Sequence, residues 1–174
     1  MKKIITIPGS IRKDSYNKAV CRYLESLSNE ELEISSFELN YLPFFNEDLE
    51  DNLPKEVKDF VSAVEKADAV IFSTPEYNNM VPGVLKNACE WLTRGYSSYA
   101  VKDKPVAIVG ASTGGFGTVR AQNQLMLLAQ IMGFKVEAGL RLPISNVQDK
   151  VDEHGQISDA DTQAKLGELV SKLE

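Results

Sequence analysis

Histidine and cysteine, the side chains that most often ligate metals or act as nucleophiles, are almost missing from this sequence. Its 174 residues include one histidine and two cysteines. Cys21 and Cys89 each fall within a predicted helix and show no metal-ligand spacing, so we expect reduced core thiols and no structural disulfide. His154 lies in a polar stretch that is typical of a surface turn. We therefore expect no metal site.

Positive charge and long hydrophobic runs are also scarce. The net charge is −6 and the isoelectric point is near 5.0, whereas nucleic-acid binding usually needs a basic face. The apolar run behind the basic residues 2–3 ends at Pro8, which is too short for a signal-peptide core, and no other segment is long and apolar enough to span a bilayer. These absences predict a cytoplasmic protein with neither nucleic acid nor a membrane as its main partner.

The sequence does contain the ordinary content of one globular domain. Hydrophobic residues make up 43% and charged residues 25%, and the chain is long enough to bury a substantial core. We expect a single domain over residues 1–174. Short apolar runs predict strands at residues 3–7, 32–37, 68–74, 104–111 and 134–138. Apolar residues at helical spacing predict helices that include residues 20–27, 57–64, 84–92, 118–132 and 166–173.

Strands that alternate with helices predict a parallel sheet covered on both faces, with right-handed crossovers. Ligands of such sheets bind beyond the carboxyl ends of the strands, where the strand order reverses. Three unusual loops follow the first, third and fourth predicted strands, at residues 9–17, 75–78 and 112–117. In the strand order 2-1-3-4-5 these three strands are neighbours. The three loops would then converge on one site.

The loop at residues 9–17 has the composition of a phosphate cradle. Gly9 permits close approach of a backbone, and a helix starting near Ser15 would aim its free N–H groups at the same point. The short donors of the loop are the hydroxyls of Ser10 and Ser15, the guanidinium of Arg12 and the amide of Asn17. An ordinary reading also fits: Ser15 caps the helix, Arg12 is solvated and Gly9 closes a turn.

Three motifs in the same order carry a resemblance to a known family. They are GSIRKDSYN at residues 9–17, PEYN at residues 75–78 followed by VPGVLKNA at residues 81–88, and STGG at residues 112–115. With these motifs the chain resembles the NADPH-dependent FMN reductases, which include quinone, azo-dye and chromate reductases. The resemblance implies a flavodoxin-like three-layer sandwich, with a five-stranded parallel sheet in the order 2-1-3-4-5 and helices on both faces.

The resemblance also implies a cofactor, FMN, with NADPH or NADH as co-substrate. The FMN phosphate would be held by the first motif, through Ser10, Arg12, Ser15 and Asn17. The flavin ring and ribityl chain would lie along Pro75, Glu76, Tyr77 and Asn78. The other edge of the ring would lie against Ser112, Thr113, Gly114 and Gly115. No side chain need act as a chemical acid or base, because the cofactor carries the redox step.

The implied function is an FMN-dependent NAD(P)H oxidoreductase. Electrons would pass from a nicotinamide through bound FMN to a small-molecule acceptor in a two-stage, ping-pong mechanism. The acceptor would be a quinone, an azo compound, free flavin or a metal oxyanion.

Two other functions compete with this one. A flavodoxin-like electron carrier would share the fold and the FMN without being an enzyme. A serine hydrolase is suggested by residues 110–114, which match G-x-S-x-G and place Ser112 between a strand and a helix. A serine nucleophile needs a base, however, and His154 lies in a polar loop beside its nearest acids.

Two further segments bear on partners and on the site. The predicted helix at residues 118–132 is apolar on more than one face, and relatives of the family form dimers and tetramers, so we expect a homodimer or homotetramer. The resemblance implies that residues 94–100 can approach the flavin of a neighbouring subunit. The aromatic, proline-containing loop at residues 41–46 either lines a pocket or packs on its own domain, and packing is slightly favoured.

Overall fold

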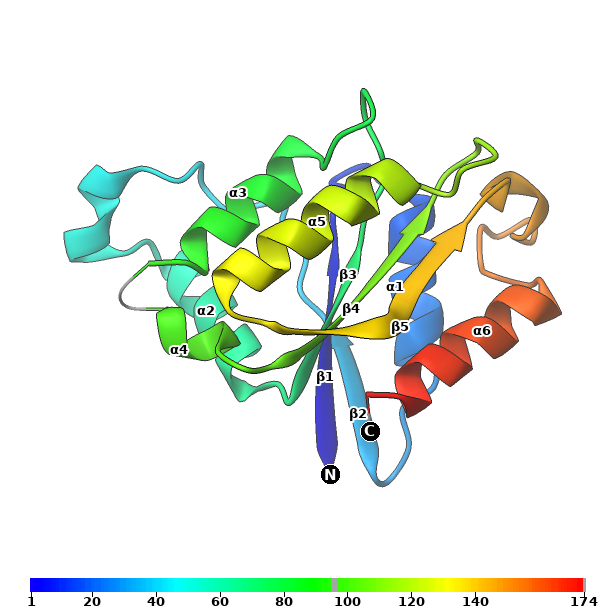
Figure 1. Ribbon diagram of the computed structural model, residues 1–174, viewed down its shortest axis with the longest axis horizontal. Coiled ribbons are helices and arrows are strands. Elements are labelled where there is room, and N and C mark those ends of the chain that lie inside the picture. The colour runs from blue at the N-terminus through cyan, green and yellow to red at the C-terminus, as the bar shows by residue number, and fades with distance from the viewer. Residues whose placement is uncertain (95–96, 174) are drawn as a thin grey trace.

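The computed structural model describes residues 1–94 and 97–173, so residues 95 and 96 of the segment 94–100 lie outside the description. Within these residues the central sheet has five parallel strands in the order β2-β1-β3-β4-β5, which confirms the predicted order. The strands are β1 (Lys2–Pro8), β2 (Leu32–Ser36), β3 (Ala69–Ser73), β4 (Pro105–Ala111) and β5 (Lys135–Ile144). The carboxyl ends of β1, β3 and β4 lie together at the upper edge of the sheet in Figure 1.

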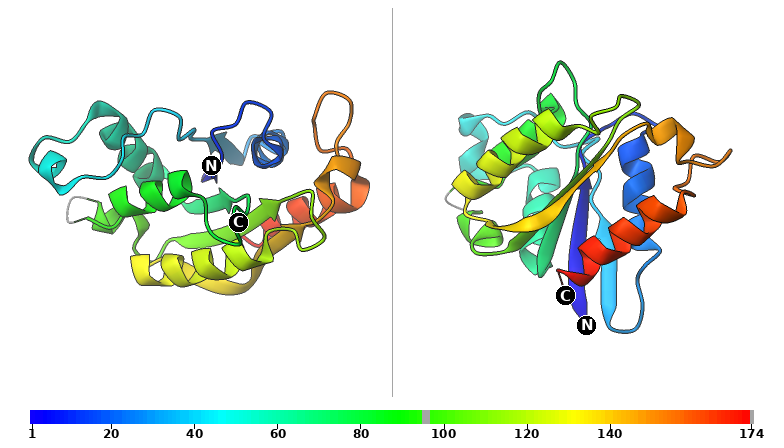
Figure 2. Two further views of the ribbon diagram at one scale, coloured as in Figure 1. Left: turned by 90° about the horizontal axis from the view of Figure 1, so that it is seen from above. Right: turned by 45° about the vertical axis from the view of Figure 1, so that its right-hand side comes forward.

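Helices cover both faces of the sheet (Figures 1 and 2). One face packs against α1 (Tyr16–Glu25) and α6 (Ala160–Ser171). The opposite face packs against α2 (Lys55–Lys66), α3 (Gly83–Trp91), α4 (Ser98–Val101) and α5 (Val119–Met132). Two short 3₁₀ helices, η1 (Glu47–Asn52) and η2 (Val147–Asp149), lie in connections. The sequence predicts the five longer α-helices, whereas α4, η1 and η2 are too short to leave a periodic pattern.

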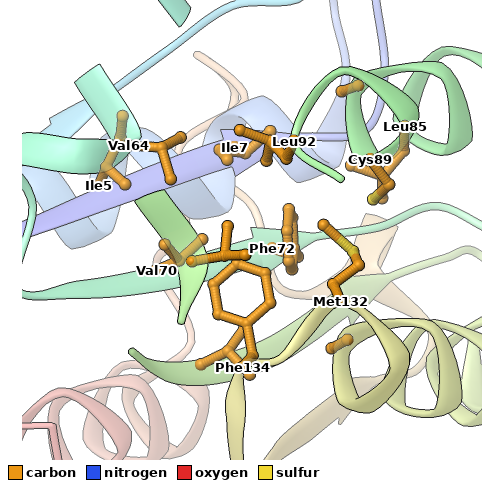
Figure 3. Close-up of a cluster of buried hydrophobic side chains, with 14 of the residues drawn as sticks. Ile5, Ile7, Val64, Val70, Phe72, Leu85, Cys89, Leu92, Met132 and Phe134 are labelled. Carbon is orange, nitrogen blue, oxygen red and sulfur yellow. The ribbon is translucent and has the colours of Figure 1, made fainter. Parts of the chain in front are cut away.

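The strands form two hydrophobic cores, one on each side of the sheet. In β3, Val70 and Phe72 face the core beneath α2, α3 and α5, whereas Ala69 and Ile71 face the core beneath α1 and α6. Successive side chains of a strand point to opposite faces, so a strand covered on both sides must be apolar throughout. Figure 3 shows the first core. In it the rings of Phe72 and Phe134 pack edge to face, with ring centres 5.8 Å apart.

Both cysteines are free and buried, and Cys89 belongs to the first of these two cores. Burial raises the pKa of the Cys21 thiol and of the Cys89 thiol to about 12 in each case, because the thiolate would lose its hydration. Neither thiol is therefore nucleophilic near neutral pH. This confirms the interpretation of both residues as reduced core thiols.

The fifth strand runs further than predicted, to Ile144 instead of residue 138. Its pairing with β4 shifts from Val106–Val136 to Ile108–Arg141, so β4 advances by two residues while β5 advances by five. Gly139 lies in this irregularity with a φ of 91°, a conformation that most side chains avoid. The break in regular pairing hid the second half of the strand from a pattern-based prediction.

The helix α5 begins and ends close to the predicted positions, and its apolar residues are not all covered. Leu125 and Ala129 are buried against the sheet, whereas Leu127 is 60% exposed and Ile131 74% exposed. Among the described residues, no helix has both the length and the apolar character needed to cross a membrane.

Candidate functional site

The three predicted loops line one cleft at the carboxyl edge of the sheet. The cleft has a volume of about 180 Å³. Its lining includes nine of the predicted site residues: Ser10, Arg12, Ser15, Asn17, Pro75, Glu76, Tyr77, Ser112 and Thr113. Asn78, Gly114 and Gly115 belong to the same loops without lining this cleft. Tyr16 and Ala111, which the sequence did not single out, complete the lining.

The first loop closes on itself ahead of α1. Ser15 is the N-cap of this helix, and its hydroxyl accepts the backbone N–H of Lys18 at 3.4 Å, as predicted. The backbone N–H of Arg12 donates to the hydroxyl of Ser10 at 3.3 Å, and its guanidinium donates to the carbonyl of Asp14. The guanidinium also lies 5.7 Å from the centre of the Tyr16 ring. Arg12 is therefore exposed at the mouth of the cleft yet held by its own loop.

The start of α1 keeps free donors on the cleft side. Among the described residues, none accepts a hydrogen bond from the backbone N–H of Tyr16 or Asn17. Such N–H groups at a helix N-terminus favour an anion, because the helix dipole adds positive potential at the same place.

The side chain of Asn17 ties the first loop to the third. Its amide nitrogen donates to the carbonyl of Ala111, and its oxygen accepts the N–H of Ala111, both at 3.0 Å. The same oxygen accepts the hydroxyl of Ser73 at 3.1 Å. Asn17 is buried, so these bonds satisfy backbone groups that water cannot reach. Its role as a phosphate contact stays a prediction beside this observed structural role.

Gly9 is explained by packing inside the protein. A Cβ at this position would meet Leu85 of α3 at 2.9 Å and Pro75 at 3.4 Å. The missing side chain therefore lets the first loop lie against α3 and the second loop. The sequence predicts that Gly9 lets the backbone approach a ligand, whereas in the structure Gly9 lets the first loop approach α3 and the second loop.

In the second loop, Glu76 joins the cleft to the start of α5. One carboxylate oxygen accepts the backbone N–H groups of Arg120 and Ala121, each at 2.9 Å. The other oxygen pairs with the Arg120 guanidinium at 3.3 Å. The carboxylate thus satisfies first-turn donors of α5, which its N-cap Thr118 leaves without a side-chain bond. Its negative charge is paired, so it does not oppose an anion in the cleft.

The same loop ends in a tight turn over residues 77–80. Tyr77 and Met80 exchange backbone hydrogen bonds at 3.0 and 3.3 Å. Asn78 and Asn79 both have positive φ, 51° and 63°, which is typical of a two-residue hairpin turn and explains asparagine at both positions. Gln124 of α5 fixes the turn, because its amide donates to the carbonyl of Asn79 and accepts the N–H of Val81. Tyr77 is left exposed at the rim of the cleft.

The third loop is held by its carbonyl groups. The carbonyl of Ser112 accepts the N–H of Val147 at 3.1 Å, and the carbonyl of Gly114 accepts the N–H of Asn146 at 3.2 Å. Within the described part of the chain, no acceptor bonds to the N–H groups of residues 113–115. A Cβ on Gly115 would meet no atom within 4 Å, so the space beside it is open. This loop therefore offers consecutive free donors to a ligand.

The same geometry argues against a serine nucleophile. The hydroxyl of Ser112 makes one hydrogen bond among the described residues, a long one of 3.5 Å to the carbonyl of Gly114. His154 lies exposed in a turn, as predicted, and its ring pairs with neighbouring Glu153 at 3.5 Å. Ser112 therefore lacks the bonded base that a catalytic triad requires.

A second, apolar cleft adjoins the first. It has a volume of about 490 Å³ and shares Ser10, Arg12 and Tyr77 with it. Its other lining residues are Ile11, Phe44, Pro82, Gly83 and Val84. Phe44 comes from the aromatic loop at residues 41–46, so both open readings of that loop hold: Leu42 packs against the core, whereas Phe44 lines a cleft. Ile11 belongs to the first motif, and Pro82, Gly83 and Val84 belong to the segment at residues 81–88 that follows PEYN.

The fold and the three-loop cleft define a flavodoxin-like α/β protein with a cleft at the carboxyl edge of its parallel sheet, which is where sheets of this kind bind ligands. Residues 2–149 match the family model described as NADPH-dependent FMN reductase, and the chain belongs to this family. It is thus an oxidoreductase of a family that uses FMN and NAD(P)H, as the resemblance implied.

Individual relatives agree with this assignment. The chain is 31% identical over 170 residues to a 2-hydroxy-1,4-benzoquinone reductase of Burkholderia sp, covering 98% of this chain and 93% of the relative. Among solved structures it is similar to FerB, a flavoenzyme NAD(P)H:(acceptor) oxidoreductase from Paracoccus denitrificans, with a TM-score of 0.84 and 30% identity over 99% of this chain and 96% of FerB. An FMN-dependent NADH-azoreductase of Bacillus anthracis, solved in complex with FMN, shares the fold with a TM-score of 0.68 and 12% identity, covering 99% of each chain.

Proposed function

We propose that this protein transfers electrons from NADPH or NADH, through bound FMN, to a small organic or inorganic acceptor in two separate stages. When bound, FMN supplies the two-electron chemistry that links a nicotinamide to quinones, azo compounds, free flavin or metal oxyanions. The observation that carries the proposal is the convergence of three loops with free donors on one cleft. We place the reaction in the cytoplasm, where thiols such as Cys21 and Cys89 stay reduced.

The residues present fit the phosphate end of FMN. Ser10 and Ser15 offer hydroxyls, Arg12 offers a guanidinium at the mouth of the cleft, and α1 offers unbonded N–H groups. A phosphate needs several donors that converge on one point together with positive potential, and these groups supply both. We assign the phosphate to this end, with Asn17 as the fourth side chain of the set.

The other two loops fit the flavin ring. A flavin that accepts a hydride gains negative charge on its pyrimidine edge, and backbone donors stabilise that charge without being titrated. The unbonded N–H groups of residues 113–115 are suited to this role, and the open space at Gly115 admits a flat ring. We assign the opposite edge of the ring to residues 75–78, where Tyr77 offers an apolar surface with a polar tip.

The proposal predicts the colour and the kinetics of the purified protein. The sample should be yellow and should release FMN on denaturation. Stopped-flow mixing with NADPH or NADH, without air, should bleach the flavin in one phase, since the protein needs no partner reductase. Steady-state rates with a quinone should give parallel lines in a double-reciprocal plot, because the nicotinamide leaves before the acceptor binds.

Each measurement has a contrary outcome. A flavin that stays oxidised in excess NADPH and NADH would indicate the electron carrier instead of the enzyme. Intersecting lines would refute the two-stage scheme while leaving the oxidoreductase in place. A colourless protein with no measurable affinity for added FMN would remove the cofactor assignment.

We also propose that the protein assembles as a homodimer or homotetramer through α5. The exposed side chains Leu127 and Ile131 line an apolar groove of about 330 Å³ with Met80 and Val81, and Lys86 is the one charged residue in its described lining. The α5 helix of a second copy matches this surface, since a two-fold interface pairs a patch with itself.

The assembly proposal predicts the sedimentation of two variants. The wild-type protein should sediment as a multiple of 19.3 kDa. Leu127→Lys combined with Ile131→Lys should dissociate it, because charge would be buried without a partner. Gln130→Lys, an exposed change on the same helix, should leave the mass unaltered. A wild-type protein that sediments only as a monomer would contradict this proposal.

A further inference from the structure

The aromatic loop at residues 41–46 is fixed to α3 on both sides of Phe44. Asn87 accepts the backbone N–H of Phe45 at 2.7 Å and donates to the carbonyl of Pro43 at 2.9 Å. The indole N–H of Trp91 donates to the same carbonyl at 2.9 Å. The backbone that carries Phe44 is therefore held in place by side chains of a packed helix.

Anchoring of this loop does not need the ring of Phe44. The ring of Phe45 packs edge to face on Trp91, with ring centres 4.9 Å apart, and the Arg94 guanidinium lies 5.0 Å from the centre of the Phe45 ring. Leu42 packs against the core. Phe44 itself is 81% exposed. A large apolar side chain on a fixed backbone, left in water by its own fold, is a feature of binding surfaces.

Phe44 lines the apolar cleft that adjoins the proposed flavin site. Ile11 and Tyr77, also exposed, line the same cleft, and Pro82 and Val84 are apolar as well. A Cβ on Gly83 would meet no atom within 4 Å, so this side of the cleft is open. The volume of about 490 Å³ lies within the range of roughly 300–1,000 Å³ that is usual for small-molecule sites.

Charge in this cleft is limited to one side chain. Arg12 is the only ionisable group other than Tyr77 in its described lining, and the proposed function assigns Arg12 to the phosphate. A small oxyanion would therefore find no unshared cation there, and its desolvation would go uncompensated. A flat, uncharged aromatic molecule would cover exposed apolar surface and stack on rings.

We propose that Phe44 is a specificity-determining residue that, with Ile11 and Tyr77, binds flat, uncharged, conjugated ring acceptors such as quinones beside the flavin. This inference rests on the proposed function. In the reaction a quinone gains two electrons and two protons and becomes a hydroquinone, while NAD(P)H loses a hydride and becomes NAD(P)⁺. The hydride brings both electrons and one proton, and solvent supplies the second proton.

The test compares two variants of the loop at residues 41–46, each of which loses one exposed aromatic ring. Phe44→Ala removes a ring from the cleft, whereas Tyr41→Ala removes a ring that is 84% exposed and does not line it. Each purified FMN-loaded variant is assayed with 2-methyl-1,4-naphthoquinone and with ferricyanide, a small anionic acceptor. For Phe44→Ala we expect KM for the quinone to rise about 10-fold, a usual effect of losing an aromatic contact, with the ferricyanide rate unchanged. Tyr41→Ala should match wild type, and Phe44→Tyr should retain the low KM.

Further measurements distinguish a role in acceptor binding from roles in cofactor binding, nicotinamide binding or subunit assembly. FMN affinity, the rate of flavin reduction by NAD(P)H and the sedimentation of Phe44→Ala should all equal those of wild type. A change in FMN affinity would place the ring in the cofactor site, a slower reduction would place it in the nicotinamide site, and an altered mass would place it in a subunit interface. Each of these results, or an unchanged quinone KM, would overturn the inference while wild-type activity upholds the proposed function. A wild-type protein without NAD(P)H oxidation would overturn both.

Discussion

Replacing Asn17 by alanine is expected to lower the free energy of unfolding of the FMN-free protein by about 3 kcal/mol. The change leaves the N–H and carbonyl of Ala111 without partners, and each unsatisfied buried group costs about 1–3 kcal/mol. Both groups lie at the end of β4, where Ala111 is buried. Urea unfolding followed by the fluorescence of Trp91, which is the only tryptophan and is buried, measures this loss. The melting temperature should fall by about 6–12 °C.

Two control variants distinguish the loss of the Asn17 hydrogen bonds from the effect of removing any asparagine side chain. Asn40→Ala removes the same side chain from an exposed loop position and should change stability by less than about 0.5 kcal/mol. Ser73→Ala removes the hydroxyl that donates to the Asn17 oxygen and that also contacts the Cys21 thiol, and it should cost about 1 kcal/mol. If Asn17→Ala unfolds at the wild-type urea concentration, the bonds to Ala111 contribute nothing, and contact with the phosphate becomes the better account of this residue.

The parts of the fold that the sequence predicts are those encoded over short distances. The buried strand β3 appears as an apolar run because both of its faces are covered, and Ser15 is recognisable as an N-cap because capping depends on its own neighbours. The position of the cleft follows in the same way, since loops after adjacent parallel strands must meet at one edge. These local signals were enough to place residues 9–17, 75–78 and 112–117 around one site.

What the sequence could not predict depends on partners far away along the chain. Asn17 bonds to a residue 94 positions later, and Glu76 bonds to backbone groups 44 and 45 positions later. Neither pairing leaves a periodic pattern, so both residues looked like ligand contacts only. The packing role of Gly9 is hidden from the sequence for the same reason, because the Leu85 side chain that fills the space beside it belongs to a distant helix.

These contacts suggest that side chains and backbone groups of the three loops have different roles. Asn17, Glu76 and Gln124 use their side chains to hold the loops to one another and to α5. The backbone N–H groups of Tyr16, Asn17 and residues 113–115 are then left in fixed positions, with no acceptor among the described residues. Donors held in this way need no reorganisation when a ligand arrives, which is the condition for strong electrostatic stabilisation. Arg12 differs, because it is exposed and the hydrogen bonds that it makes to described residues all lie within its own loop.

Replacing Arg12 by alanine is therefore expected to weaken FMN binding and leave the fold intact. A hydrogen bond to a charged group contributes about 1.5–3 kcal/mol, which corresponds to an increase of roughly 10- to 150-fold in the dissociation constant. The urea midpoint of the FMN-free protein should not change, since within the described part of the chain the guanidinium interacts with the carbonyl of Asp14 and the Tyr16 ring, both close to it in sequence. Titration of FMN-free protein with FMN, followed by quenching of flavin fluorescence, measures the affinity.

Lys13 provides the matched control for Arg12, because it carries the same charge on the next residue of the loop and is exposed as well. Lys13→Ala should change the FMN dissociation constant by less than about 3-fold, the size expected for a screened surface charge. Arg12→Lys should give an intermediate loss, since lysine keeps the charge and lacks the planar pair of donors. Equal losses for Arg12→Ala and Lys13→Ala would mean that the loop attracts the phosphate only through its overall charge. Unchanged affinity in Arg12→Ala would show that the loop is an ordinary turn ahead of a capped helix.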